Sequence, residues 1–299
     1  VAVAPDGHIG VAWYRYLWNS ATGERNYNIY FVVLDSAGDL VYGPTNVTNN
    51  SIWGDYDEYG VPQIYDPRIA ATGDNRFVLA WYRYESQAAG SVQDVYYAIR
   101  ESTGAEVVPV TALTADWPGY DQGYASPTVT RAGSGGALIA WTQGSDSDIY
   151  YSVRDSAGNL IKPPTSIPTI SSWDIDAVEL SNGHILLAWS SWQDGIYHIS
   201  YAMLDAGHSL VAGPTVLSNE AALRGEAYVS VTADDAGHGI LTWADYGYSY
   251  RPHLYYALVD SSGALLTGPM NFYTSHAAYP YLEVNLDGYG NTSYNWTPP

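Results

Sequence analysis

Three loops of this chain each set a tryptophan within four residues of one or two aspartates. These groups are Trp53 with Asp55 and Asp57, Trp117 with Asp121, and Trp173 with Asp174 and Asp176. A fourth pair, Trp192 with Asp194, follows the third loop. An indole can stack on the apolar face of a sugar ring, while carboxylates accept hydrogen bonds from its hydroxyls. The pattern therefore predicts a ligand-binding arc; tryptophan lids over the core with turn-capping aspartates are the alternative.

Aspartates two residues apart are also a spacing that binds hard cations. Such pairs occur at Asp55 and Asp57 and at Asp146 and Asp148, which makes these four residues calcium candidates. No segment carries the full twelve-residue calcium-loop pattern that ends in a glutamate. The chain has no cysteine, and its seven histidines lack the spacing of zinc ligands. Calcium is thus the one cofactor that the sequence leaves open.

The elements that must position these loops repeat along the chain. A tryptophan closes a short apolar run six times, at Trp13, Trp81, Trp141, Trp189, Trp243 and Trp296. Alternating apolar and polar residues and glycine- or asparagine-containing turns around them predict four antiparallel strands per unit. A repeat of this size is typical of a β-propeller blade. We therefore predict an all-β propeller of six bladed units, the last incomplete, with the recurring aromatic side chains packed between blades.

We expect a single domain over residues 1–299, built from consecutive blades. The blades span about 1–50, 62–114, 125–168, 175–218, 226–273 and, in part, 279–299. The last unit lacks its outer strand pair, and three explanations are open. The residues can be part of a longer chain, or a neighbouring molecule can pair with the open edge of the last blade. Alternatively, the ring has five blades and the last two strands are a trailing hairpin. Turns on one side of the blades are short and uniform, so we expect function on the side of the long loops.

The composition restricts the partners. The net charge is −20 and the chain has a single lysine, Lys162. This charge argues against nucleic acid, whose phosphates need a basic face, and against an anionic membrane surface. No stretch is apolar enough to span a bilayer. Many Tyr, Trp, Thr, Asn and Gly residues with little Lys or Glu resemble a secreted protein, so we expect an extracellular or cell-surface location.

The third strand of the unit and the turn after it resemble the repeated segment of sialidase-like propellers. The segment reads DIYYSVRDSAGNLIKPPTSI, and related forms such as YALVDSSGALLTGPMNF occur in five units. In that family an Asp-box of the form Ser-X-Asp-X-Gly-X-Thr-Trp follows a similar strand, whereas in this chain the Thr-Trp end is absent each time. The resemblance implies a six-bladed fold, a secreted setting, and three arginines that hold a substrate carboxylate.

Arg68 lies at a central position of that kind, in the first strand of the second blade, and is a further ligand-binding candidate. The matching places in later blades lie near Thr128, Ala177, Val229 and Leu282. An arginine triad therefore does not form at these places, and the resemblance extends to the fold rather than to sialidase activity.

Three functions from different classes follow from these observations. The main prediction is a non-catalytic extracellular module for binding or adhesion, with a carbohydrate or protein ligand on the long-loop face. The first alternative is a structural subunit of a surface layer or extracellular filament, in which a neighbour completes the last blade. The second alternative is a sialidase-like glycoside hydrolase. No serine-elbow, phosphate-loop or zinc-protease motif indicates another enzyme class, and the sequence favours a protein that is not an enzyme.

Overall fold

The computed structural model describes residues 1–54, 60–87, 90–114, 127–133, 135–143, 148–193, 195–217, 227–245, 253–274, 281–286 and 292–297. Every regular element in these ranges is a β-strand. The strands form five four-stranded antiparallel sheets and one two-stranded sheet, each with its strands in chain order. The predicted four-stranded unit is therefore confirmed. The chain divides into two compact units, Val1–Ser166 and Ile167–Pro299, and each is described by itself.

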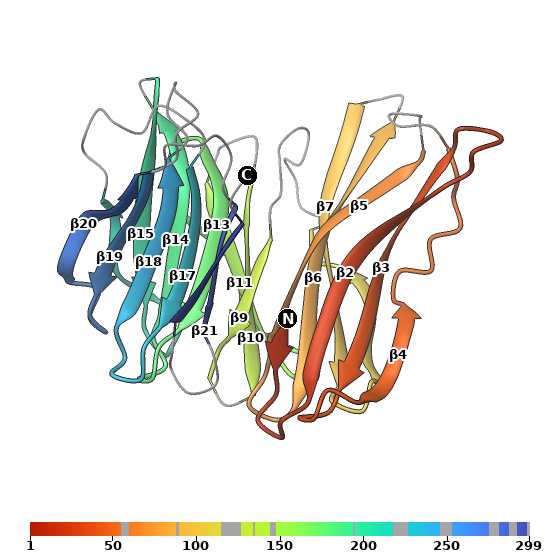
Figure 1. The fold of residues 1–299 in the computed structure, drawn as a ribbon, viewed down its shortest axis with the longest axis horizontal. Helices are drawn as coiled ribbons and strands as arrows, with labels where there is room; N and C mark the ends of the chain where they lie inside the picture. Colours follow the sequence, from red (N-terminus) through yellow and green to blue (C-terminus); the bar gives the residue numbers. More distant parts are fainter. Residues whose placement is uncertain are drawn as a thin grey trace. The chain divides into compact units, whose positions relative to one another are not determined.

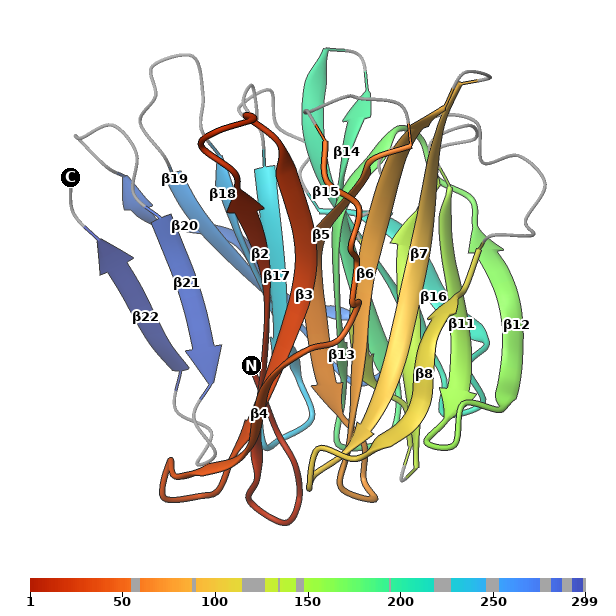
Figure 2. The same ribbon diagram turned by 90° about the vertical axis from the view of Figure 1, so that its right-hand side faces the viewer.

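The first unit holds three of the four-stranded sheets, and Figure 2 shows β5 to β8 in sequence. The first sheet comprises β1 (Ala2–Val3), β2 (Ile9–Trp18), β3 (Arg25–Leu34) and β4 (Leu40–Asn46). The second comprises β5 (Pro62–Ala71), β6 (Arg76–Gln87), β7 (Gly90–Glu101) and β8 (Glu106–Ala112). The third comprises β9 (Thr128–Arg131), β10 (Gly136–Thr142), β11 (Ile149–Asp155) and β12 (Leu160–Ile167). The first strands of these sheets meet, because β5 contacts both β1 and β9.

The second unit holds two four-stranded sheets and the two-stranded one (Figure 1). One sheet comprises β13 (Ser172–Glu179), β14 (Ile185–Gln193), β15 (Ile196–Leu204) and β16 (Leu210–Val216). The next comprises β17 (Ala227–Ala233), β18 (Gly239–Asp245), β19 (His253–Val259) and β20 (Leu265–Thr274). The hairpin of β21 (Tyr281–Leu286) and β22 (Thr292–Thr297) follows. In this unit too the first strands of neighbouring sheets meet, since β13 contacts β17. That the whole chain forms a single domain stays a prediction.

The recurring tryptophans pack as the sequence predicts wherever their side chains are described, which leaves out Trp296. Trp81, Trp141, Trp189 and Trp243 are at most 1 % exposed. In four sheets the indole stacks on a tyrosine of the adjacent strand, with ring centroids 5.7–6.3 Å apart; the pairs are Trp13–Tyr30, Trp81–Tyr96, Trp141–Tyr150 and Trp243–Tyr255. These stacks bury large apolar surfaces between neighbouring sheets. They hold the frame from which the long loops extend.

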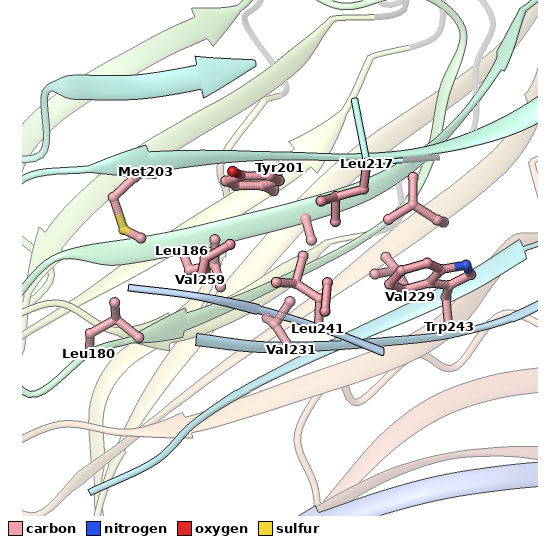
Figure 3. Close-up of a cluster of buried hydrophobic side chains, with 13 residues drawn as sticks. Leu180, Leu186, Tyr201, Met203, Leu217, Val229, Val231, Leu241, Trp243 and Val259 are labelled. Carbon is pink, nitrogen blue, oxygen red and sulfur yellow. The ribbon is translucent and has the colours of Figure 1, made fainter. Parts of the chain in front are cut away.

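The main core of the second unit lies between the sheets β13–β16 and β17–β20. Figure 3 shows Leu186, Tyr201 and Met203 of the first sheet facing Leu241 and Trp243 of the second. Strand residues point alternately to the two faces of a sheet, so every second residue of β14 and β15 reaches this core. The Tyr201 hydroxyl donates a hydrogen bond of 2.9 Å to the carbonyl of a turn glycine in the facing sheet. The Tyr201 hydroxyl therefore has a hydrogen-bond partner within this apolar core.

Aspartates shape the turns between the third and fourth strands. The Oδ1 atom of Asp155 accepts hydrogen bonds from the N–H groups of Ala157 and Asn159, at 2.9 and 2.8 Å. Gly158 takes the left-handed φ of +87° that the tight turn needs. Asp35 and Asp260 bond the N–H groups two and four residues ahead in the same way. This recurring geometry gives the Asp-box-like segment a structural role.

Stability at acid pH is expected to depend on these turn aspartates. The side chain of Asn159, together with the turn N–H groups, holds the pKa of Asp155 below its ordinary value, and the Ser262 hydroxyl lowers the pKa of Asp260. Each group has a lower pKa in the folded than in the unfolded chain. Its bonds therefore stabilise the fold above pH 4, and this stabilisation is lost as the pH falls below about 4.

Urea unfolding at pH 6 and pH 3 measures this loss. We expect no more than about 0.5 kcal/mol from each carboxylate, because both lie at the surface. The variant Asp155→Asn should show a smaller difference between the two pH values than the wild type. An equal difference in both proteins would contradict this assignment.

The outer strands are poor templates for further strand pairing. Each contains a proline, which lacks an N–H donor; these are Pro44, Pro109, Pro163, Pro214 and Pro269. The pairing of β4, β8, β16 and β20 with the preceding strand also shifts register along its length. Both features protect exposed sheet edges from other chains. Self-association through the edge of the last blade stays a prediction.

Candidate functional site

Two of the predicted tryptophans lie together on one face of the β13–β16 sheet. Trp173 of β13 pairs with Ser190 of β14, and Trp192 lies two residues further along β14. Residues two apart on a strand share a face, so the two indoles are diagonal neighbours, at a typical separation of about 7–8 Å. Their exposed fractions are 42 % and 40 %. The Tyr197 ring of β15 meets Trp192 edge-on, with centroids 4.6 Å apart, and rests on the buried core.

We call Trp173, Trp192 and Tyr197 the aromatic ledge. Cross-strand hydrogen bonds fix the backbone beneath its two exposed indole rings, so the points from which the rings project are set without a ligand. The Trp192 N–H, for example, donates to the carbonyl of Ser171 at 3.0 Å. Such a surface can receive the apolar face of a flat ligand at little cost in conformational entropy.

A β-bulge at Asp174 determines on which face of the sheet Trp173 lies. The register shifts between Trp173 and Ile175, and Asp174 takes a positive φ of 33°. The extra residue puts Trp173 on the same face as Asp176, although regular alternation would put them on opposite faces. The bulge thus turns Trp173 toward the side on which β17 lies.

The carboxylates of Asp174 and Asp176 tie β13 to β17. Asp174 Oδ2 accepts the N–H of Val229 at 2.8 Å, and Asp176 Oδ2 accepts the N–H of Val231 at 2.9 Å. The hydroxyl of Ser230 also donates to Asp176 Oδ2, at 3.2 Å. These bonds satisfy N–H groups on an edge strand that no further strand covers. They give both aspartates a structural role, and ligand contacts from them stay a prediction.

Trp53 lies in the first unit and is 41 % exposed. Its neighbour Gly54 exchanges backbone hydrogen bonds with Arg25 of β3, at 2.8 and 3.1 Å. The buried Asn26 side chain donates to the carbonyls of Asn50 and Ile52, at 2.9 and 2.8 Å. The segment that carries Trp53 is therefore held against the sheet. Trp53 presents a further exposed indole, in a different unit from the ledge.

A cavity of about 120 Å³ lies between the first two sheets of the first unit. Thr48, Asn50, Ile52, Trp81 and Arg83 are among the residues that line it. Pockets that enclose organic ligands usually measure about 300–1,000 Å³. This cavity is too small to enclose a sugar together with its hydroxyls.

Arg68 is exposed on β5, the first strand of its sheet. It pairs with Ala80, the residue before a recurring tryptophan. At the same register the later sheets hold Thr128, Asp176, Ser230 and Glu283. The predicted equivalents Ala177, Val229 and Leu282 are therefore one residue away from this register. Among the described strands, Arg68 is the arginine at this register.

Several predicted site residues lie outside the described ranges. They are Asp55, Asp57, Trp117, Asp121, Asp146 and Asp194. The calcium candidate Asp148 is described, and its backbone carbonyl accepts the N–H of Gln143 at 3.0 Å. Within the described ranges, no three His, Asp or Glu side chains are placed to hold a metal ion. In the same ranges no helix could cross a membrane.

The sequence did not single out Tyr197, Tyr65 or Asp66. Tyr197 lies three residues before Ser200, the partner of Trp189, and so outside the recurring tyrosine positions. Asp66 takes a positive φ of 48° at a register shift of β5, and this bulge carries no sequence signal other than the following proline. The cross-strand pairing of Trp192 with Tyr197 becomes visible only when the register is known.

No protein-family model matches the chain, and no curated protein matches its sequence. Its fold is similar to that of NanB sialidase from Streptococcus pneumoniae, with a TM-score of 0.55 and 9 % identity over 88 % of this chain and 59 % of that one. The polysaccharide lyase Uly1 is similar with a TM-score of 0.52 and 10 % identity, over 95 % and 73 % of the chains. An α-L-arabinanase from Penicillium chrysogenum is similar with a TM-score of 0.51 and 15 % identity, over 88 % and 75 %.

These likenesses establish the class of fold. The sialidase and the arabinanase are β-propellers, so the predicted propeller of four-stranded blades and its sialidase-like resemblance are confirmed. At identities of 9–15 % the likeness concerns the fold, and function must be argued from the site.

Proposed function

We propose that this protein is a carbohydrate-active β-propeller that holds a polysaccharide on the aromatic ledge. The observation that carries this proposal is the pair of exposed indoles, Trp173 and Trp192, on one face of one sheet. Sugar rings stack their C–H faces on such surfaces, and a polymer offers several rings to neighbouring indoles. The negative charge of the chain favours a neutral polymer over a polyanion. A protein of this function acts outside the cell or at its surface.

A catalytic role in glycoside cleavage is the second candidate. The similar structures are a sialidase, a polysaccharide lyase and an arabinanase, which supports an enzyme better than the non-catalytic module predicted from the sequence. Hydrolysis requires two carboxyl groups at a defined separation across the scissile bond. The loops of this chain are rich in aspartate, so they contain carboxyl groups that could form such a pair.

Loss of the ledge indoles is expected to weaken polysaccharide binding. Each of Trp173→Ala and Trp192→Ala removes one stacking surface and should lower the affinity about tenfold. Affinity gel electrophoresis with arabinan, xylan, galactan and polygalacturonate measures retention. The control is Trp18→Ala, which removes an indole that is 63 % exposed and lies outside the ledge. Equal retention of all four proteins would overturn the ledge as the binding surface.

Release of reducing ends from the same polymers tests cleavage. A wild-type protein that binds a polymer and releases new ends supports the second candidate. Binding without the release of reducing ends, over hours at high protein concentration, supports the binding function only. Unsaturated products, detected by their ultraviolet absorbance, would indicate a lyase reaction instead of hydrolysis.

A further inference from the structure

Two aspartates occupy the same bulge in the first strands of their sheets, and one of them has no contact that explains it. Asp66 of β5 and Asp174 of β13 take positive φ values of 48° and 33°, each where the strand register shifts. This conformation is unfavourable for residues other than glycine. Asp174 uses it to accept the N–H of Val229. Asp66 is exposed, and its carboxylate has no hydrogen-bond or ion-pair partner among the described residues.

Two further polar residues of β5 share a face of the sheet, because Gln63 pairs with Tyr84 and Arg68 with Ala80, four residues apart on β6. Arg68 is exposed and, within the described ranges, likewise lacks a partner. Gln63 is only 2 % exposed; its Oε1 atom accepts the Tyr65 hydroxyl at 2.8 Å, while its Nε2 atom has no partner in the described structure. A buried amide N–H without an acceptor is costly, and native proteins rarely keep one. Because this Nε2 atom is buried, Gln63 supports the Tyr65 hydroxyl from beneath the surface and is not itself a ligand contact.

Tyrosine rings surround the same stretch of β5. The Tyr65 ring contacts those of Tyr14, Tyr27 and Tyr82, with centroids 5.3–5.8 Å apart. Tyr14 is 44 % exposed. An aromatic cluster thus involves the same stretch of β5 that carries an exposed acceptor, Asp66, and an exposed donor, Arg68.

We infer that β5 forms a sugar subsite in which the exposed side chains of Asp66 and Arg68 bind the hydroxyl groups of a neutral sugar ring beside the Tyr65 cluster. The inference rests on the proposed carbohydrate function and names the class of sugar. A carboxylate accepts and a guanidinium donates, so together they suit neighbouring hydroxyls, which do both. The two charges cancel, and Asp66 repels an acidic sugar as strongly as Arg68 attracts it. The strained φ of Asp66 is then the cost of presenting its carboxylate to the ligand.

Binding of single sugars tests this subsite apart from the ledge. Saturation-transfer NMR titrations use L-arabinose, D-galactose, D-xylose and D-glucuronate as probes. We expect at least one neutral sugar to bind, and glucuronate to bind more weakly. Asp66→Asn and Arg68→Gln should each weaken neutral-sugar binding at least tenfold. Trp173→Ala, which changes the ledge alone, should leave the affinity for that sugar within about twofold.

Glycine at the two bulges separates a ligand role from a structural role. Asp66→Gly relieves the positive φ and should leave Tm unchanged or raise it by about 1–2 °C while sugar binding is lost. Asp174→Gly gains the same relief but loses the bond to Val229, so its Tm should fall. An equal fall in both variants would show that Asp66 is structural and overturn the inference.

The remaining outcomes separate this inference from the proposed function. If no neutral sugar binds, if its binding is unchanged in Asp66→Asn and Arg68→Gln, or if glucuronate binds more tightly than every neutral sugar, the β5 subsite is refuted. Polymer retention that still depends on Trp173 would then leave the proposed function standing. If polymer retention is equal in all ledge variants while sugar binding depends on Asp66, the ledge is refuted as the binding surface. The β5 subsite is then supported.

Discussion

The variant Trp141→Ala is expected to lose about 3–5 kcal/mol of unfolding free energy, a larger loss than we expect for any of the other variants. The indole is fully buried against Ala80, Val95 and Tyr97 of the neighbouring sheet and stacks on Tyr150 of its own. Truncation leaves a large cavity that strands paired on both sides cannot close. Since natural domains are stable by about 5–15 kcal/mol, a substantial part of the stability is lost.

Urea unfolding followed by far-ultraviolet circular dichroism measures this effect. The control Trp18→Ala removes an exposed indole and should change the free energy by less than about 1 kcal/mol. Trp141→Phe is informative as well, because the Nε1 atom of Trp141 is buried without a partner in the described structure. The phenyl ring keeps much of the packing and removes the unpaired donor, so its cost should be well below that of alanine. Similar losses for Trp18→Ala and Trp141→Ala would refute the packing role.

Replacement of Asp176 by alanine should cost about 2–3 kcal/mol, the second largest effect. The carboxylate accepts the N–H of Val231 and the hydroxyl of Ser230, so alanine leaves two donors of β17 without an acceptor. Hydrogen bonds to a charged group are worth more than neutral ones, and an unsatisfied donor adds its own cost. The loss should appear as an earlier unfolding transition in calorimetry.

Two comparisons define the origin of this loss. Asp176→Asn keeps an oxygen acceptor and should cost less than half as much as alanine. Asp66→Asn changes an exposed carboxylate without described partners and should leave stability within about 0.5 kcal/mol. If Asp176→Ala unfolds like the wild type but binds polysaccharide more weakly, Asp176 serves the ligand and not the fold.

Together these variants separate the frame of the protein from its binding surfaces. Residues that repeat in each sheet, such as Trp81, Trp141 and Trp243, are buried and should affect stability. Residues that break the repeat, such as Trp173 and Trp192, are exposed and should affect binding. Propellers combine a repeated frame with variable loops, so the two classes of substitution should have separable effects.

The amino-acid sequence by itself determined the strand pattern, the turns and the packing positions. Each depends on local chemistry: alternation fixes which side chains are buried, glycine supplies the positive φ of the turns, and aspartates such as Asp155 bond the turn backbone within four residues. The tryptophan–aspartate pattern also identified two exposed indoles, Trp173 and Trp192, that share a face.

Only the tertiary structure decided the roles of the aspartates and the composition of the ledge. Asp174 and Asp66 occupy the same bulge, yet one bonds the next sheet and the other has no described partner, a difference that depends on contacts more than fifty residues away in the chain. Tyr197 joined the ledge because the hairpin register places it opposite Trp192. Register shifts of one residue reverse the face of a side chain, and the bulge that causes such a shift in β13 has no distinct residue pattern. For this reason the residues of the frame are readable from the sequence, whereas the assignment of carboxylates to fold or ligand required the structure.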